Sequence, residues 1–285
     1  MDTGRLLIQC PDRTCIVAAV SGFFSEQGAN ITDLDQHSTD PKGGRFFMRL
    51  ELELSDLDQR ISALREAFAA SVAGRFDMQW QLNCASQRPR MAILVSRHEH
   101  ALLELLWKHA RGELHADISC VMSNHETLRS QVEAFGIEFQ SFDVSSGNKA
   151  QAHAQMLEQL KSCADLVVLA RYMQILPPDW VEACPNRIIN IHHSFLPAFV
   201  GADPYQQAFA KGVKLIGATA HYVTEQLDEG PIIEQDTARV THRHSVDDMR
   251  QLGRNLERHA LARAVQWHLQ DRVIVVGAKT IVFSR

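Results

Sequence analysis

The pattern of apolar residues changes at residues 84–90, and this change limits the possible folds more than any other feature of the sequence. The segment is polar and contains Pro89, which is typical of a linker between domains. Short strands and two helices are predicted before it, whereas strands alternate regularly with helices after it. We therefore predict a first domain over residues 1–83, a linker over 84–90 and a second domain over 91–285.

The first domain has the predicted element order βαββαβ, the split arrangement of a ferredoxin-like fold. In the strand at 45–54, Phe47, Arg49, Glu51 and Glu53 alternate with four aliphatic residues, which predicts one solvated face and one buried face. The other predicted elements are strands at 6–10, 31–38 and 75–82 and helices at 57–72 and at 14–27, the latter capped by Thr14.

Predicted strands and helices alternate along the second domain, as in an α/β protein. Residues 91–95 form a continuous apolar run, as expected for a parallel strand that is buried on both faces. We predict a mostly parallel, Rossmann-like sheet and a long helix at 246–269, and the pattern leaves the placement of the tail at 273–283 open. Further strands are predicted at 117–122, 166–170, 187–191 and 215–223, and further helices at 101–111, 127–135 and 149–162.

Composition narrows the functional classes. The formal net charge is -5 and no block of Lys and Arg is present, so we expect no nucleic-acid partner. No apolar run reaches the ~18 residues that a membrane span needs, and the start lacks the pattern of a secretory signal. The six cysteines form no C-x-x-C pair, which is typical of reduced thiols. We therefore expect a cytoplasmic protein with no membrane partner.

Two polar residues, Asn190 and His192, end the predicted strand at 187–191, and ligands of open α/β sheets bind beyond such strand ends. The residues are two positions apart, so their side chains share one face, with Cα atoms roughly 6.6 Å apart. An amide beside an imidazole can stabilise the oxyanion that forms when a carbonyl is attacked. An Asn that caps a turn beside a packed His fits this short pattern equally well.

Asp228 lies in a loop at 224–230 that follows the predicted strand at 215–223. A carboxylate at a loop tip is usually a solvated turn former. Folded over Asn190 and His192, however, it would orient a water molecule and accept its proton. Glu225 and Glu229 are alternative acids for which we expect solvent-facing positions.

Histidine pairs raise the alternative of a metal site. H-x-H spacing occurs at 98–100 and at 242–244, and His192 adjoins His193. No Cys or acidic residue completes a known ligand pattern, so we expect no metal. The Gly-rich motifs of nucleotide sites and the G-x-S-x-G of serine hydrolases are also absent from the sequence, and no cofactor is predicted.

Two segments of the first domain resemble an ACT domain, a module that often dimerises and binds amino acids as a regulator. They are Cys-Pro-Asp-Arg at 10–13 and Gly-Ala-Asn-Ile at 28–31. The resemblance implies a homo-oligomer and an amino-acid effector. Cys15 stands where such domains usually have glycine, and its side chain would narrow an effector site.

Three motifs in the second domain resemble the formyltransferase family that uses 10-formyltetrahydrofolate: NIHHSFLP at 190–197, GATAH at 217–221 and LDEGP at 227–231. The longer string over 190–205, with an ACT domain in front, resembles the deformylase branch of that family. The resemblance implies that Asn190, His192 and Asp228 are catalytic. It assigns the pteridine to the segment Met173, Gln174, Ile175 and Leu176, and the loop over the folate to 223–228, which includes Val223 and Glu225.

The loop at 96–100 favours hydrolysis over transfer. Relatives that formylate glycinamide ribonucleotide have a Gly-rich phosphate loop there, and this chain has no glycine in it. The resemblance then implies hydrolysis of 10-formyltetrahydrofolate, which supplies formate and tetrahydrofolate to one-carbon and purine metabolism. His193, Ser194 and Tyr205 are candidates for shaping the water site. Transfer to an unidentified amine and a non-catalytic folate or amino-acid sensor stay open.

Overall fold

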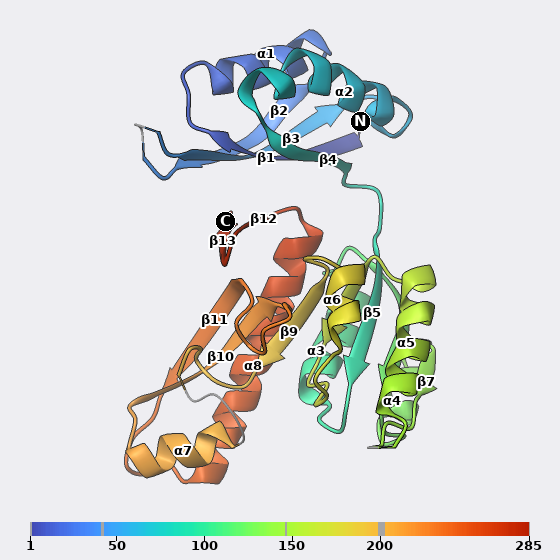
Figure 1. The fold of residues 1–285 in the computed structure, drawn as a ribbon, viewed down its shortest axis with the longest axis vertical. Coiled ribbons are helices and arrows are strands. Elements are labelled where there is room, and N and C mark those ends of the chain that lie inside the picture. The colour runs from blue at the N-terminus through green and yellow to red at the C-terminus, as the bar shows by residue number, and fades with distance from the viewer. Residues whose placement is uncertain (1, 41–42, 146, 199–202, 285) are drawn as a thin grey trace. The chain divides into compact units, whose positions relative to one another are not determined.

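The computed structural model describes residues 2–40, 43–145, 147–198 and 203–284. The chain divides into two compact units (Figure 1). The first contains the residues up to Arg88 together with Gln270–Ile274 and the segment from Ile281 onward. The second contains Pro89–Leu269 and Val275–Thr280. The tail, which the sequence prediction assigned entirely to the second domain, is therefore divided between the units.

The first unit is a four-stranded antiparallel sheet with strand order β2-β3-β1-β4, and it confirms the predicted βαββαβ fold. The elements are β1 (Asp2–Pro11), α1 (Ile16–Glu26), β2 (Asn30–Ser38), β3 (Arg45–Leu54), α2 (Leu57–Ser71), a 3₁₀ turn η1 (Ala73–Phe76) and β4 (Gln79–Cys84). The strand predicted at 75–82 begins later because residues 73–76 form the 3₁₀ turn.

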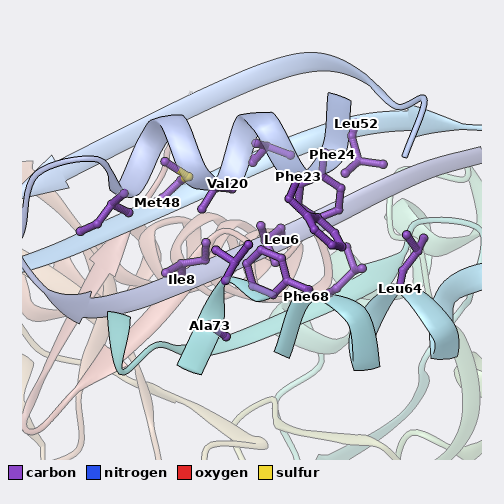
Figure 2. Close-up of a cluster of buried hydrophobic side chains, with 14 of the residues drawn as sticks. Leu6, Ile8, Val20, Phe23, Phe24, Met48, Leu52, Leu64, Phe68 and Ala73 are labelled. Atoms are coloured by element: carbon purple, nitrogen blue, oxygen red, sulfur yellow. The ribbon is translucent and has the colours of Figure 1, made fainter. Parts of the chain in front are cut away.

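The core of the first unit lies between the sheet and its two helices (Figure 2). Three phenylalanine rings form its centre: Phe68 of α2 stacks on Phe24 and meets Phe23 edge-on, with ring centroids 5.7 and 5.3 Å away. Aliphatic side chains of β1 and β3, such as Leu6 and Met48, are buried against them. Each such side chain contributes about 2 kcal/mol by leaving water.

Helix α1 begins differently from the prediction. Cys15, and not Thr14, occupies the N-cap position, and no side chain caps the helix. The φ angle of Cys15 is 72°, in the left-handed region that glycine adopts without strain. The conformation explains why a glycine suits this position in the domain that the sequence resembles, and it leaves the Cys15 side chain exposed.

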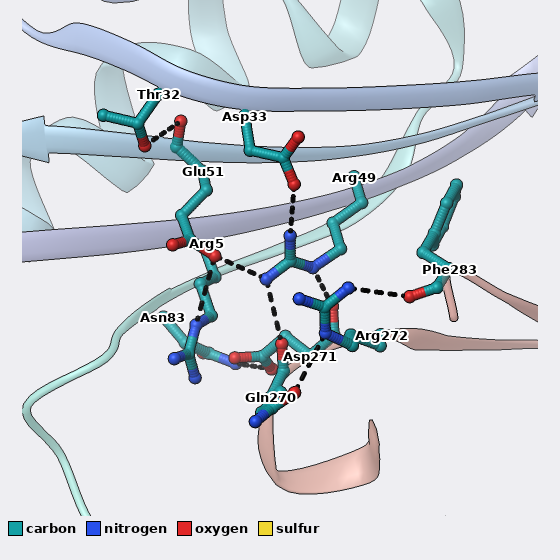
Figure 3. Close-up of polar contacts among 10 residues, drawn as sticks. All are labelled: Arg5, Thr32, Asp33, Arg49, Glu51, Asn83, Gln270, Asp271, Arg272 and Phe283. Atoms are coloured by element: carbon teal, nitrogen blue, oxygen red, sulfur yellow. Dashed lines mark hydrogen bonds and ion pairs between the residues drawn. The ribbon is translucent and has the colours of Figure 1, made fainter. Parts of the chain in front are cut away.

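The predicted solvated face of β3 is wrong for Phe47, which is buried, and for Arg49, whose side chain is only 2% exposed. Its guanidinium donates hydrogen bonds to the carboxylates of Asp33 and Glu51 and to the backbone carbonyls of Gln270 and Asp271 (Figure 3). The tail therefore covers this part of the sheet. The sequence pattern could not show this because Gln270 lies 221 residues from Arg49 along the chain.

The second unit is a seven-stranded sheet with strand order β11-β10-β9-β8-β5-β6-β7. The five neighbouring strands β9, β8, β5, β6 and β7 are parallel, and β10 pairs antiparallel with both β9 and β11, which confirms a mostly parallel α/β domain. The strands are β5 (Arg90–Val95), β6 (Asp117–Ser123), β7 (Phe139–Ser141), β8 (Leu166–Leu169), β9 (Ile188–His192), β10 (Leu215–Tyr222) and β11 (Ile232–Arg239).

Six helices accompany the sheet: α3 (His100–Ala110), α4 (Arg129–Glu133), α5 (Lys149–Cys163), α6 (Pro178–Ala183), α7 (Pro204–Lys211) and α8 (Val246–Leu269). The tail forms two short paired strands, β12 (Val273–Val276) and β13 (Lys279–Val282). Sequence patterns missed β7, β11, α6 and α7. Among the described residues, no helix combines the length and the apolar character that crossing a membrane requires.

Strand order positions the site. β5, β8 and β9 are neighbours and run parallel, so the loops that follow them meet at one edge of the sheet. Segments that are far apart in sequence, such as 96–99, 170–176 and 192–194, are thereby brought together. In doubly wound sheets this edge is where ligands bind.

Candidate active site

The structure brings Asn190, His192 and Asp228 together. Asn190 and His192 lie two residues apart on β9, as the strand pattern predicts. The loop after β10 folds back so that Asp228 Oδ2 lies 3.2 Å from His192 Nδ1. These three residues therefore come from one strand end and one loop.

Gly230 allows this loop to fold back. A Cβ atom at this position would overlap the carbonyl oxygen of Tyr222, so glycine is required for the close approach. The Pro231 carbonyl then accepts a hydrogen bond from the Tyr222 N–H at 3.0 Å. Asp228 has a φ angle of 58°, a left-handed conformation that Asp tolerates better than most residues.

His221 is a fourth polar residue of the site, and sequence reasoning assigned it no role. It lies opposite Asn190 in the antiparallel β9–β10 pair. Its Nδ1 is 2.9 Å from the Tyr222 carbonyl oxygen, so Nδ1 carries the proton and donates it there. Its Nε2 can then accept a hydrogen bond from the Asn190 amide at 3.2 Å. This contact fixes the orientation of the Asn190 side chain.

Burial keeps His221 neutral, because desolvation lowers the pKa of its imidazole despite the hydrogen bond to Tyr222. For Asp228, burial acts against ionisation, but the hydrogen bond from His192 and the charges of the neighbouring histidines outweigh it. The pKa of the Asp228 carboxyl therefore lies below its usual value of 3.8. Asp228 is a carboxylate at neutral pH.

One nitrogen of the site is left for a ligand. His192 Nε2 is buried and has no hydrogen-bond partner among the described residues, whereas Nδ1 faces Asp228. Buried polar atoms without partners are rare in native proteins and frequently mark functional positions. An incoming carbonyl oxygen or water would satisfy this nitrogen.

Exposed apolar side chains come from the segment that the sequence assigned to a pteridine. Met173 is 54% exposed and Ile175 is 61% exposed, while Gln174 and Leu176 are half-buried. The Met173 N–H donates a hydrogen bond to Ser96 Oγ at 3.0 Å, which anchors the segment to the loop after β5. Val223 packs on the core, and Glu225 is exposed as expected.

The three candidates for a water site lie near His192. His193 is half-buried, and its ring centroid is 5.2 Å from that of His192 and 6.2 Å from that of Tyr205. Burial, together with the charge of Arg171, lowers the pKa of His193 to about 4. Ser194 Oγ donates a hydrogen bond to the Ala198 carbonyl, and Tyr205 Oη donates one to the buried carboxylate of Glu257.

The histidine pairs show no metal-binding geometry. Within residues 2–40, 43–145, 147–198 and 203–284, no group of three or more His, Cys, Asp or Glu side chains is placed to hold a metal ion. His98 and His100 have ring centroids 6.2 Å apart, and His100 Nε2 instead lies 2.8 Å from Glu257 Oε2.

Two protein families match this chain. The ACT domain family matches residues 4–69, and the formyl transferase family matches residues 89–265. A formyltetrahydrofolate deformylase of Bacillus subtilis is 55% identical over 99% of this chain and 94% of its own length. The crystal structure of a formyltetrahydrofolate deformylase from Pseudomonas syringae superposes with a TM-score of 0.93 at 48% identity, covering 99% of this chain and 95% of that chain.

The chain belongs to the formyltetrahydrofolate deformylase family. Both resemblances that the sequence motifs indicated are thus confirmed. The family also explains the order of the two units, because the relatives are matched over nearly their whole length.

The second unit shares its fold with a transferase. The glycinamide ribonucleotide transformylase 1 of Symbiobacterium toebii superposes with a TM-score of 0.65 at 30% identity, covering 68% of this chain and 94% of that chain. The same formyltransferase fold therefore occurs in proteins named as deformylases and in proteins named as transformylases.

Proposed function

We propose that this protein hydrolyses 10-formyltetrahydrofolate to formate and tetrahydrofolate. The observation that carries the proposal is the cluster of Asn190, His192 and Asp228, in which His192 Nε2 is buried without a partner among the described residues. The names of the relatives support the substrate and the reaction. The exposed apolar segment at Met173 and Ile175 supports a flat, largely apolar ligand beside the cluster.

The proposed reaction begins with water. The Asp228 carboxylate accepts a hydrogen bond from the attacking water and takes up its proton. The water oxygen forms a bond to the formyl carbon, and the carbonyl oxygen becomes an oxyanion. The amide of Asn190 and the Nε2–H of protonated His192 donate hydrogen bonds to this oxyanion. Asp228 then delivers the proton it took from water to N10, and the C–N10 bond breaks as the oxyanion re-forms a carbonyl. The products are tetrahydrofolate and formic acid, which ionises to formate.

The environment supports these roles. The lowered pKa of Asp228 keeps the acceptor ionised. The Asn190–His221 contact at 3.2 Å holds the amide in one orientation, so no reorganisation is needed as charge develops. His193 stays neutral, which avoids a second positive charge competing for Asp228. The reaction as written uses no metal and no cofactor.

The folate would lie over the segment of Met173, Gln174, Ile175 and Leu176, with Val223 and Glu225 in the loop that closes over it. Release of formate and tetrahydrofolate would serve one-carbon and purine metabolism. We further expect the first unit to act as an ACT domain that pairs protein chains and binds an amino acid. Light scattering and an amino-acid binding screen would test these expectations, and a cytoplasmic location stays a prediction.

The direct test is a release assay in which no amine acceptor is present. We expect formate and tetrahydrofolate in equal amounts from wild-type protein. Asn190→Ala and His192→Ala should each lose about 10²–10³-fold in turnover, the effect of removing one oxyanion donor. Asp179→Asn, an exposed acid at the start of α6, is the matched control and should behave as wild type. If product forms only after an amine is added, the protein is a formyltransferase and not a hydrolase.

A further inference from the structure

A cavity of about 260 Å³ lies in the second unit beside the proposed catalytic residues. Its lining comes from the loop after β5 and the start of α3, from Arg171 after β8, from His193 after β9, from α7 with its N-cap residue Asp203, and from α8. His193 connects the two regions, because its ring lies 5.2 Å from that of His192. Nothing in the proposed reaction uses the other groups that line this cavity.

Both acidic side chains that line the cavity already have hydrogen-bond or ion-pair partners within the protein. Glu257 is buried, and its carboxylate is 2.8 Å from His100 Nε2, 3.0 Å from Tyr205 Oη and 3.5 Å from Arg171 Nε. At the rim, Asp203 forms an ion pair with Arg250 at 3.0 Å. Because a third arginine also lines the cavity, its charged groups carry an excess of one positive charge when the histidines are neutral.

Two guanidinium groups of the cavity have unused donors. Arg171 Nη1 is buried and has no hydrogen-bond partner among the described residues. Arg254, on α8, is exposed at the rim, and within the described part of the chain no hydrogen bond or ion pair is found for it. A buried donor without a partner is satisfied by an acceptor from outside the protein, such as an anion or water.

Burial and a neighbouring positive charge both disfavour the protonated form of two histidines that line the cavity. The pKa values of His98 and His193 are both lowered, first by burial and next by the charge of Arg171. An anion in the cavity would lie against neutral imidazoles, which can donate hydrogen bonds, and against guanidinium groups, which bind carboxylates with two parallel hydrogen bonds.

We propose that this cavity is an anion pocket that receives formate after hydrolysis. The inference rests on the proposed function, which converts a neutral formyl group into a carboxylate next to His192. The folate occupies the apolar side of the site, so the new anion is drawn to the side where the arginines lie. The volume of about 260 Å³ accommodates formate together with several water molecules. Formate then leaves before tetrahydrofolate.

Binding of ¹³C-formate to the full-length protein, saturated with tetrahydrofolate, tests the pocket by NMR line broadening. We expect saturable broadening for wild type and at least a tenfold weaker affinity for Arg254→Gln, with recovery in Arg254→Lys. Arg258→Gln is the matched control, since Arg258 is one turn further along α8 and pairs with Glu104 at 2.7 Å. Formate binding that is absent, or equally tight in Arg254→Gln, overturns the proposal.

The same preparations separate this inference from the proposed function. Product-inhibition kinetics should show formate as a noncompetitive inhibitor against 10-formyltetrahydrofolate, because it is the first product to leave. Hydrolysis without saturable, Arg254-dependent formate binding overturns the pocket and keeps the hydrolase. Arg254-dependent formate binding in a protein that releases no formate supports the pocket and overturns the hydrolase.

Discussion

The two units each bury a polar cluster, and the clusters differ in how completely they are paired. In the first unit, all three nitrogens of the Arg49 guanidinium donate hydrogen bonds, to two carboxylates and two backbone carbonyls (Figure 3). In the second unit, His192 Nε2 and Arg171 Nη1 are buried without partners among the described residues. A cluster that satisfies itself holds a structure together, whereas one with unused donors is arranged for a ligand.

The physical basis is the cost of burying polar groups. An unpaired buried donor costs about 1–3 kcal/mol, and a bound ligand or water recovers that cost. Arg49 has no unpaired nitrogen, and its hydrogen bonds to the Gln270 and Asp271 carbonyls hold the tail against the sheet. The site around His192 is less stable than it could be, and the comparison predicts opposite responses to mutation in the two regions.

The largest effect should come from Asp228→Asn. The amide keeps the shape of the side chain but cannot accept a proton, so we expect turnover to fall about a thousandfold. The free energy of unfolding should change by less than about 1 kcal/mol, because hydrogen bonds to the neighbouring histidines remain possible. Steady-state kinetics and urea unfolding measure the two quantities. Turnover within tenfold of wild type would exclude Asp228 as the base.

Arg49→Leu should show the opposite response. The variant loses a buried guanidinium and its hydrogen bonds to Glu51 and to two backbone carbonyls. Because Asp33 is exposed and Glu51 keeps Arg5 at 3.8 Å, we expect a loss of about 2 kcal/mol of stability. Hydrogen exchange of β3 amides reports this loss in the first unit. Arg45→Leu is the control on the same strand, because Arg45 is exposed. An equal response of the two variants would mean that the Arg49 cluster is not structural.

Stability should also depend on pH through buried histidines. Burial lowers the pKa of His268 to about 4. Between pH 6.5 and about 4, His268 is therefore protonated in the unfolded chain but stays neutral in the folded chain. The stabilisation is complete above pH 6.5 and is lost as the pH falls, by up to about 3 kcal/mol. Urea unfolding of wild type and His268→Phe across this range should show a shallower slope in the variant. Parallel slopes would contradict the assignment.

The smallest effect is expected for His221→Gln. Glutamine can still accept a hydrogen bond from the Asn190 amide but holds it less rigidly, so turnover should fall about tenfold. Because the account gives His221 the role of positioning Asn190, KM should stay near the wild-type value. His221→Phe, which removes the acceptor, should lose more turnover. A change in KM alone would argue for direct contact between His221 and the substrate.

Local patterns predicted what depends on local sequence. The strand at 45–54 and the helix at 246–269 have the predicted bounds because their periodicity is strong. The shared face of Asn190 and His192 follows from strand alternation. His221 was missed because its role depends on the antiparallel pairing of β10 with β9, which one sequence does not reveal.

Contacts between residues that are far apart along the chain could not be predicted either, because they depend on how the elements pack. His100 and Glu257 are 157 residues apart, and their contact exists only because α3 and α8 pack together. The burial of Arg49 likewise depends on a tail whose placement no pattern fixed. The residues alone offered the combination of Asp228 with the two β9 residues only as an alternative to a solvated turn, because loop folding is not periodic. The family resemblance then favoured the combination.

A single turnover of wild type and of Asp228→Asn in H₂¹⁸O, with no amine acceptor present, tests most directly whether Asp228 activates water. The account predicts formate with one ¹⁸O atom and no ¹⁸O in Asp228 from wild type, and the same labelled formate about a thousandfold more slowly from the variant. Mass spectrometry of formate and of the peptide that contains residue 228 measures both labels. Labelled formate at the wild-type rate from Asp228→Asn, or ¹⁸O in the Asp228 carboxyl of wild type, would contradict the account.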